Sequence, residues 1–230
     1  MLKLKELTVE YQDGTRAINE MTFSIDTGEN VALIGANGAG KTSLILALVG
    51  ILQAKRGTVQ ICGISVEKKS LRDIRSRIGL VFQNPDDQLF MPTIHEDVAF
   101  GPRSYGCCEG EVERRVNGAL SSLGIVHLAD RSPLKLSGGE KRLAAIATVL
   151  AMDPDFLLFD EPTAFLDPRA RRNLTSVLLG LPQGKLIATH DLPFAKEVCT
   201  RVLLIQGGKL MADGARELLT DTDTLEAAGL

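Results

Sequence analysis

Short segments with a mostly apolar centre and polar ends occur along the chain at 30–35, 77–83, 155–161, 185–191 and 201–206. Runs of this length, bounded by turn residues, are typical of strands that are buried on both faces. The stretches between them are longer, and several have the apolar spacing of helices. Strands that alternate with helices predict an α/β fold whose mostly parallel sheet is covered on both faces.

Residues 1–30 follow a different pattern. Charged and apolar residues alternate there, and the turn sequences QDGT and TGE interrupt them. This pattern predicts short strands, which we assign to an N-terminal antiparallel β subdomain.

The segment 84–136 has no strand pattern. Residues 108–124 have apolar side chains at helical spacing and end at Gly124, a common helix terminator. We therefore expect an inserted α-helical subdomain. Further helices are expected at 40–52, at 137–152 and from near Pro168 and Pro193, and a final hairpin should precede a short helix.

These elements predict a single domain over residues 1–220, followed by a C-terminal tail at 221–230. Residues 1–83 and 151–220 should supply the core and the β subdomain. Residues 84–150 should supply the helical subdomain.

Composition narrows the class of protein. The chain has 230 residues, a formal net charge of -3 and four cysteines. The lack of a basic excess argues against a nucleic-acid partner, and the cysteines, without a CxxC pair, favour reduced thiols over a disulfide framework or a zinc site. The N-terminus shows no apolar run of a secretory signal, and the apolar stretch 44–52 is about half a membrane span. We expect a chain that does not cross a membrane.

The sequence GANGAGKT at 35–42 matches the phosphate-binding pattern G-x-x-x-x-G-K-[ST]. It follows a predicted strand and precedes a predicted helix, as this loop requires; a glycine-rich turn without a ligand is the alternative. Its amides can converge on phosphates, and Lys41 adds a full positive charge at the helix N-terminus. The hydroxyl of Thr42 is placed for Mg²⁺. We assign phosphate binding to Gly35, Asn37, Gly38, Gly40, Lys41, Thr42 and Ser43.

Two adjacent carboxylates, Asp160 and Glu161, end the apolar run FLLFDE. Because side chains alternate along a strand, the two groups can take different roles. We expect Asp160 to face a metal ion through its waters, and Glu161 to act near a terminal phosphate as general base or water-positioning group. The alternative is a strand that simply ends in acidic residues before a proline turn.

Gln83 and His190 also end predicted strands. The carboxyl ends of strands in an open α/β sheet are where ligands bind, although a lone histidine there is often structural. Tyr11 could stack on a purine base or pack against its own hairpin.

The sequence LSGGE at 136–140 offers a second anion-binding site. Ser137, Gly138 and Gly139 begin a predicted helix but have no lysine or metal ligand of their own. Such a half-site suits a phosphate that another chain presents.

These motifs, in this order over residues 11–191, resemble the nucleotide-binding subunits of ATP-binding cassette (ABC) transporters. GANGAGKT is similar to the Walker A motif, FLLFDE to Walker B and LSGGE to the family signature. The resemblance implies a P-loop NTPase fold, ATP and Mg²⁺ as ligands, and two subunits paired head to tail around two ATP molecules. It also implies that Gln83 is the Q-loop residue near the metal, that Asp167 is the D-loop residue near nucleotide, and that His190 is the switch histidine. With Glu161, this gives Gln83 and His190 as catalytic residues and Thr42, Gln83 and Asp160 as metal ligands.

The segment GLVFQNPDDQLFMPTIHEDVAFGP at 79–102 resembles energy-coupling-factor ATPases and their cobalt and nickel relatives. That branch drives uptake of transition-metal ions or vitamins across prokaryotic membranes. It works at the cytoplasmic face with a transmembrane coupling protein and a substrate-binding membrane protein. By this resemblance, residues 83–100 should receive the coupling protein, with Asp86, Asp87 and Gln88 at the contact.

The chain departs from the family in two places. Ala164 and Phe165 precede Leu166-Asp167, where smaller residues are commoner in the family. The chain also ends soon after its last predicted strand, so we expect the extra C-terminal domain of many relatives to be absent or vestigial.

Other functions fit less well. A soluble mechanochemical ATPase acting on DNA would need long coiled coils, and one acting on ribosomes usually carries two cassettes. A P-loop kinase for a small molecule would leave LSGGE and His190 without a role. The sequence leaves open the transported substrate, and whether the second ATPase subunit is identical or a paralogue.

Overall fold

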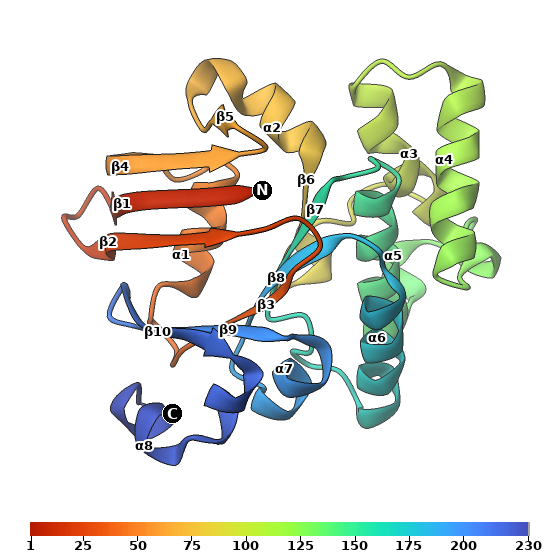
Figure 1. Ribbon diagram of the computed structural model, residues 1–230. Coiled ribbons are helices and arrows are strands. Elements are labelled where there is room, and N and C mark those ends of the chain that lie inside the picture. The colour runs from red at the N-terminus through yellow and green to blue at the C-terminus, as the bar shows by residue number, and fades with distance from the viewer. Residues whose placement is uncertain (230) are drawn as a thin grey trace.

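The computed structural model describes residues 1–229 and contains two sheets with helices packed around them (Figure 1). The larger sheet has the strand order β10-β9-β3-β8-β7-β6. Its neighbouring strands are parallel except for β10, which pairs antiparallel with β9. Its strands are β3 Asn30–Ile34, β6 Ile78–Val81, β7 Phe156–Asp160, β8 Gly184–Thr189, β9 Arg201–Gln206 and β10 Lys209–Ala215.

Both faces of the larger sheet are buried, as the mostly apolar segments predict. Along β3, Val31 and Leu33 belong to one hydrophobic core, whereas Ala32 and Ile34 belong to the other. Since side chains alternate along a strand, the four successive apolar residues 31–34 supply both cores at once. The mostly parallel α/β fold is confirmed.

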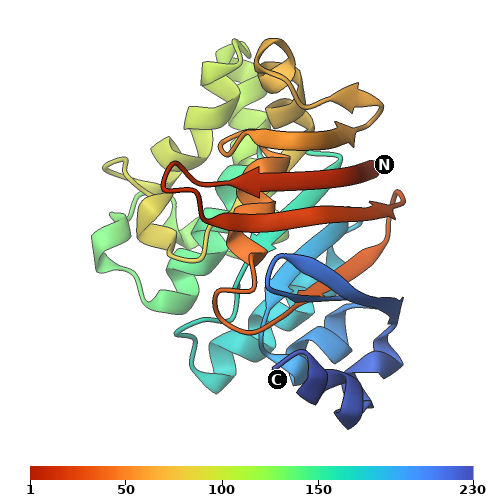
Figure 2. The same ribbon diagram turned by 90° about the vertical axis from the view of Figure 1, so that its left-hand side faces the viewer.

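The second sheet is antiparallel and has the order β2-β1-β4-β5. Helix α1 lies between the two sheets (Figure 2), and its apolar residues share a core with both. The predicted helix at 40–52 is wrong at its C-terminal end, because α1 stops at Leu48 and Gly50 turns the chain with φ 67°. The elements are β1 Leu2–Glu10, β2 Arg16–Ile25, α1 Lys41–Leu48, β4 Ala54–Ile61 and β5 Ile64–Ser65.

Helices occupy the middle of the chain, and no strand occurs between residues 84 and 136. Helix α4 covers the predicted amphipathic segment and is followed by Gly124 with φ 68°. Helix α5 contacts α3, α4, α6 and the end of the larger sheet at β6. The three helices are α3 Ile94–Ser104, α4 Glu109–Ser122 and α5 Gly138–Leu150.

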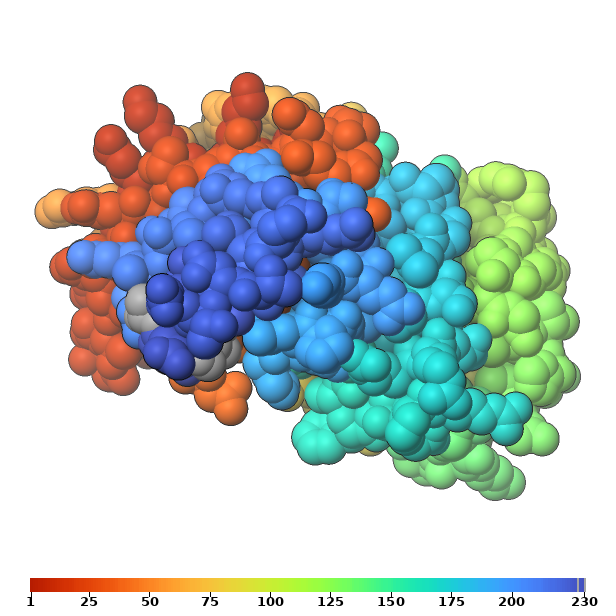
Figure 3. Space-filling view, turned by 60° about the horizontal axis from the view of Figure 1, so that its bottom comes forward, coloured from red at the N-terminus to blue at the C-terminus, as the bar shows by residue number. Residues whose placement is uncertain are grey.

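The remaining helices cover the outer parts of the larger sheet. Helix α2, before β6, is not anticipated by the sequence analysis. In the space-filling view, the C-terminal segment and the residues of α4 lie at opposite sides of the face, with α6 and α7 between them (Figure 3). No helix among residues 1–229 is long and apolar enough to cross a membrane. These helices are α2 Leu71–Arg77, α6 Pro168–Gly180, α7 Leu192–Val198 and α8 Thr222–Ala227.

Candidate functional site

The glycine-rich loop 35–40 joins β3 to α1 and has no room for a side chain at Gly35 or Gly40. A Cβ atom at Gly35 would lie 2.5 Å from the carbonyl oxygen of Ile205. Gly40 has φ 105°, and a Cβ there would lie 2.6 Å from the carbonyl oxygen of Ala17. The positive φ and the close backbone approach both explain why glycine is needed at Gly40.

Lys41 is buried and folds back over this loop. Its Nζ donates to the carbonyl oxygens of Gly35 at 2.7 Å and Ala36 at 3.3 Å. It also lies 3.4 Å from Oε1 of Glu161. The ammonium is thus fixed beside the start of α1, where a phosphate would meet both its charge and the amides of the helix N-terminus.

Asp160 and Thr42 meet across the end of the sheet. The Thr42 hydroxyl donates to Oδ2 of Asp160 at 2.8 Å, while Oδ1 is buried without a hydrogen-bond partner. Burial raises the pKa of Asp160, and the neighbouring carboxylate of Glu161 adds to this, outweighing the hydrogen bond from Thr42. A buried carboxylate with a free oxygen beside a hydroxyl is a suitable partner for a hydrated Mg²⁺ ion. The residues present therefore fit the expected metal.

The side chains of Asp160 and Glu161 have different surroundings, but alternation along one strand, the predicted reason, is wrong. Strand β7 ends at Asp160, and Glu161 has φ 44°, outside the strand region. A sharp backbone turn, rather than alternation along a strand, therefore separates the two carboxylates. Positive φ is uncommon for a residue other than glycine and often marks functional positions.

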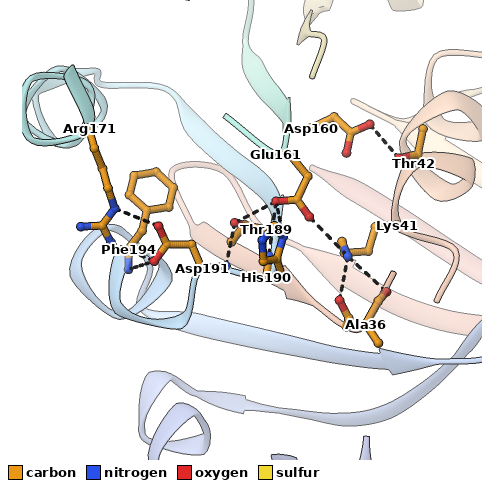
Figure 4. A network of polar contacts seen from close by, with 11 residues as sticks. Ala36, Lys41, Thr42, Asp160, Glu161, Arg171, Thr189, His190, Asp191 and Phe194 are labelled. Atoms are coloured by element: carbon orange, nitrogen blue, oxygen red, sulfur yellow. Dashed lines mark hydrogen bonds and ion pairs between the residues drawn. The ribbon is translucent and has the colours of Figure 1, made fainter. Parts of the chain in front are cut away.

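The carboxylate of Glu161 is held by several donors (Figure 4). Its Oε2 lies 2.9 Å from Nδ1 of His190 and accepts from the hydroxyl of Thr189 at 3.2 Å. The backbone N–H of His190 also donates to Oε2, at 3.4 Å. Lys41 approaches the other oxygen. The buried carboxylate therefore has one oxygen fixed by the turn after β8 and the other directed toward the glycine-rich loop.

The turn that carries His190 is also held by hydrogen bonds of the next residue, Asp191. Asp191 accepts two hydrogen bonds from the guanidinium of Arg171, both 2.8 Å long, and caps α7 by accepting from the N–H of Phe194. Burial alone would raise the pKa of Asp191, but the hydrogen bonds from Arg171 and Phe194 outweigh it and lower the pKa. Figure 4 shows this chain of contacts running from α6 to Glu161.

A cavity of about 560 Å³ brings together most of the predicted site residues. The ring of Tyr11 forms part of its wall and is 41% exposed, while the Tyr11 hydroxyl lies 2.8 Å from Oγ of Ser43. Gly35 and Asp160 lie outside the lining. The predicted residues that line the cavity are Tyr11, Asn37, Gly38, Gly40, Lys41, Thr42, Ser43, Gln83, Glu161 and His190.

Ser137, Gly139 and Asp167 lie in a different cavity, of about 600 Å³, between the starts of α5 and α6. Ser137 caps α5 and exchanges hydrogen bonds with Glu140, whose carboxylate accepts from the Ser137 hydroxyl at 2.7 Å. Asp167 caps α6 by accepting from the N–H groups of Arg169 and Ala170. Gly138 is next to these residues but outside the lining. One chain therefore does not bring LSGGE into the cavity of Lys41.

Sequence reasoning missed several residues of the first cavity. Thr15, Arg16 and Ala17 line it from the start of β2, and Phe165 lines it from the loop before α6. The position of Arg16 directly after the turn that follows Tyr11 could have indicated it. Phe165 has φ 62° and is 93% exposed, which no sequence pattern predicts.

The sequence pattern that describes ABC transporters matches residues 18–164. The chain belongs to the ABC transporter family. A putative ABC transporter ATP-binding protein of Geobacter sulfurreducens is 47% identical over 99% of this chain and 91% of its own length. The energy-coupling factor transporter ATP-binding protein EcfA of Carboxydothermus hydrogenoformans is 42% identical over all of this chain and 86% of its own.

Solved structures agree with this membership. The structure of cbiO1 from Clostridium perfringens, described as part of the ABC transporter complex cbiONQ, has a TM-score of 0.88 and 35% identity, covering 97% of this chain and 92% of that one. A dimeric structure of the ATP-binding cassette MJ0796 bound to ADP and Pi has a TM-score of 0.83 and 26% identity, covering 94% and 99%. This ABC family member is therefore an ATPase, and the expected ATP-binding cassette fold is confirmed.

Proposed function

We propose that this ABC ATPase powers an energy-coupling-factor type uptake transporter by closing head to tail with a second ATPase subunit. The observation that carries the pairing is the separation of Lys41 and Ser137 into two cavities of one chain. Each half lacks what the other offers, so a symmetric pair would complete two ATP sites in one interface. The second subunit can be a copy of this chain or a paralogue.

Within each site the chain's own residues have separate tasks. Lys41 and the loop amides bind the phosphates, and Thr42, Asp160 and Gln83 would hold Mg²⁺. That ion supplies positive charge that neutralises the phosphate oxygens. Glu161 accepts the proton of the attacking water, and His190 holds Glu161 in place.

The γ-phosphate explains how ATP drives movement. It would contact the amides of Gly138 and Gly139 and the hydroxyl of Ser137 on the partner subunit as well as Lys41 on its own. Hydrolysis breaks this link between subunits, so the pair should close with ATP and open with ADP.

A docking face for the membrane coupling protein lies at the start of α3. We define this face by Phe90, Met91 and Phe100. Phe90 is 63% exposed, and its ring meets that of Phe100 edge to face at a centroid distance of 5.0 Å. The N–H groups of Phe90 and Met91 both donate to Oδ1 of buried Asp97, at 3.0 Å each. A loop held this firmly while presenting aromatic rings to solvent suits an apolar helix of a partner protein.

The segment before this face is less suited to docking than its sequence indicates. Asp86 pairs with Lys141 at 2.6 Å, and the side chain of Gln88 makes three hydrogen bonds within the chain. Substituting either residue would disturb α5 as well as the surface. Of Asp86, Asp87 and Gln88, Asp87 is therefore the best position for a substitution that tests docking at the surface.

We propose cobalt or nickel as the transported substrate, with a vitamin as the alternative. The resemblance of the segment 79–102 to energy-coupling-factor ATPases and their cobalt and nickel relatives supports the metal ions. Substrate choice would belong to the membrane partners, because they form the pathway. The chain would act at the cytoplasmic face of the membrane.

The test compares Phe90→Ser with Leu179→Ser, a matched change at an exposed apolar residue on α6. We expect the unchanged chain and Leu179→Ser to copurify with a membrane coupling protein and to support uptake of radioactive cobalt or nickel. Phe90→Ser should lose both and keep its ATPase activity in solution. Unchanged uptake by Phe90→Ser would contradict the docking face, and uptake of a vitamin instead of the metal ions would contradict the substrate.

A further inference from the structure

The loop that carries Gln83 is bound to helix α5 by the side chain of Arg142. This arginine is only 1% exposed. Its two terminal nitrogens donate to the carbonyl oxygens of Phe82 and Gln83, each at 2.6 Å. Both acceptors are backbone atoms, so the contact fixes the path of the chain at Gln83 whatever the Gln83 side chain does.

A second residue joins the same two segments. Gln88 accepts from the N–H of Phe82 at 3.2 Å and donates to the carbonyl oxygen of Ala145 and the hydroxyl of Thr148, at 2.8 Å each. The acceptors Ala145 and Thr148 lie on α5 beyond Arg142, one helical turn apart. The loop 82–88 is therefore hydrogen-bonded to α5 along more than one turn.

Packing alone would not favour an arginine at this position. The Nε atom of Arg142 is buried without a hydrogen-bond partner. Burial lowers the pKa of Arg142 to about 10, opposed by the charge of Asp160, so the side chain is still cationic at neutral pH. No carboxylate contacts it among the ion pairs of residues 1–229. Because a buried charge without a paired counter-charge costs free energy, an apolar side chain of similar length would be cheaper if filling space were its only role.

Helix α5 and its N-cap also line the other cavity, through Ser137, Gly139, Glu140, Arg142 and Leu143. Ser137 caps its N-terminus, five positions before Arg142 on the same helix. Gln83 lines the cavity of Lys41 in the same chain. The hydrogen bonds of Arg142 would therefore transmit a displacement of α5 at Ser137 to the backbone of Gln83.

We propose that Arg142 is a positioning residue that couples the two ATP sites of the paired ATPase. When Ser137 engages the nucleotide of the partner subunit, α5 shifts, and Arg142 carries Gln83 with it into its own site. Occupation of one site thereby sets the metal-binding geometry of the other. This inference rests on the proposed pairing, and it assigns the communication between sites to one side chain.

The test measures ATPase rate against Mg-ATP concentration for the purified chain and for Arg142→Met and Gln88→Met. Cooperative sites in a pair give a Hill coefficient of up to about 2. We expect the Hill coefficient of both variants to fall toward about 1. The dilute variants should bind ATP with the affinity of the unchanged chain. Arg142→Lys should recover part of the cooperativity. Gln88→Met carries the test if Arg142→Met fails to fold, because it introduces no change of charge.

The matched control is Arg115→Met. Arg115 lies on α4, and its guanidinium approaches the carbonyl oxygens of Ala151 and Met152 at 3.5 and 3.4 Å, just beyond the other end of α5. The Arg115→Met variant should keep the cooperativity of the unchanged chain. Full cooperativity in both Arg142→Met and Gln88→Met would overturn the coupling role and leave the pairing intact. An unchanged chain that shows no cooperativity and never pairs with ATP would overturn the proposed pairing itself.

Discussion

Nδ1 of His190 lies 2.9 Å from Oε2 of Glu161, and the two side chains differ sharply in exposure. Glu161 is 8% exposed, whereas His190 is 60% exposed. The histidine therefore covers the carboxylate from the solvent side and leaves the other oxygen facing Lys41. A general base needs this kind of fixed orientation before its substrate arrives.

Glu161→Gln should bind ATP but hydrolyse it slowly. General-base catalysis typically contributes about 10²–10⁴ in rate, so a loss of that size is expected. Because the γ-phosphate then persists, the variant should accumulate as a dimer on gel filtration with Mg-ATP and return to monomer with ADP. A variant that turned over rapidly and stayed monomeric at saturating ATP would contradict the assigned role.

Asp160→Asn should stabilise the nucleotide-free protein while removing Mg²⁺-dependent hydrolysis. Burial raises the pKa of Asp160, which means that its charged form is disfavoured in the folded state at neutral pH. A neutral amide relieves that cost, and each kcal/mol gained should raise the Tm by about 2–4 °C. Thermal melts without nucleotide measure this change in Tm. Thr42→Val is the control, because it removes the donor of the Thr42–Asp160 hydrogen bond and keeps the carboxylate. A lower Tm for Asp160→Asn would show that the charge is not a cost in the folded protein.

Tyr11→Ala should weaken ATP binding without slowing the chemical step. If the ring stacks on the purine, its loss costs about 1–3 kcal/mol, or about 5- to 150-fold in KM, with kcat unchanged. Tyr11→Phe keeps the ring and loses only the contact with the Ser43 hydroxyl, so its KM should stay close to that of the unchanged chain. Equal KM values for the Ala and Phe variants would show that the ring does not support binding.

Asp191→Asn should destabilise the protein in a pH-dependent way. The pKa of Asp191 in the folded state is lowered below its ordinary value of 3.8, so the charged pair with Arg171 stabilises the fold above that value and is lost as pH falls through the lowered pKa. Losing hydrogen bonds to a charged group costs about 1.5–3 kcal/mol. Asn can still cap α7, so the variant tests the loss of the negative charge apart from the loss of the helix cap. Melting curves at neutral pH should show a lower Tm for the variant, and this difference should narrow below pH 3.8 and close as the pH falls through the lowered pKa of Asp191. A difference that persists below that pKa would contradict the charged pair.

The sequence by itself determined the class of fold and predicted the candidate site residues. The runs of mostly apolar residues in β3, β7 and β8 require a sheet buried on both faces, because a strand turns successive side chains to opposite sides. Spacing alone identified Lys41, Thr42, Asp160 and Glu161, because a phosphate loop and a strand-end carboxylate are local motifs whose neighbours in sequence are also neighbours in space.

Only the tertiary structure decided which distant residues meet. The contact between Arg142 and Gln83, the Arg171–Asp191 pair and the separation of Ser137 from Lys41 join or divide segments that lie far apart in the chain. It also showed that Glu161 leaves its strand with a positive φ. Such contacts depend on how helices pack on the sheet, and that packing is set by side chains from many elements at once, so no single stretch of sequence specifies it.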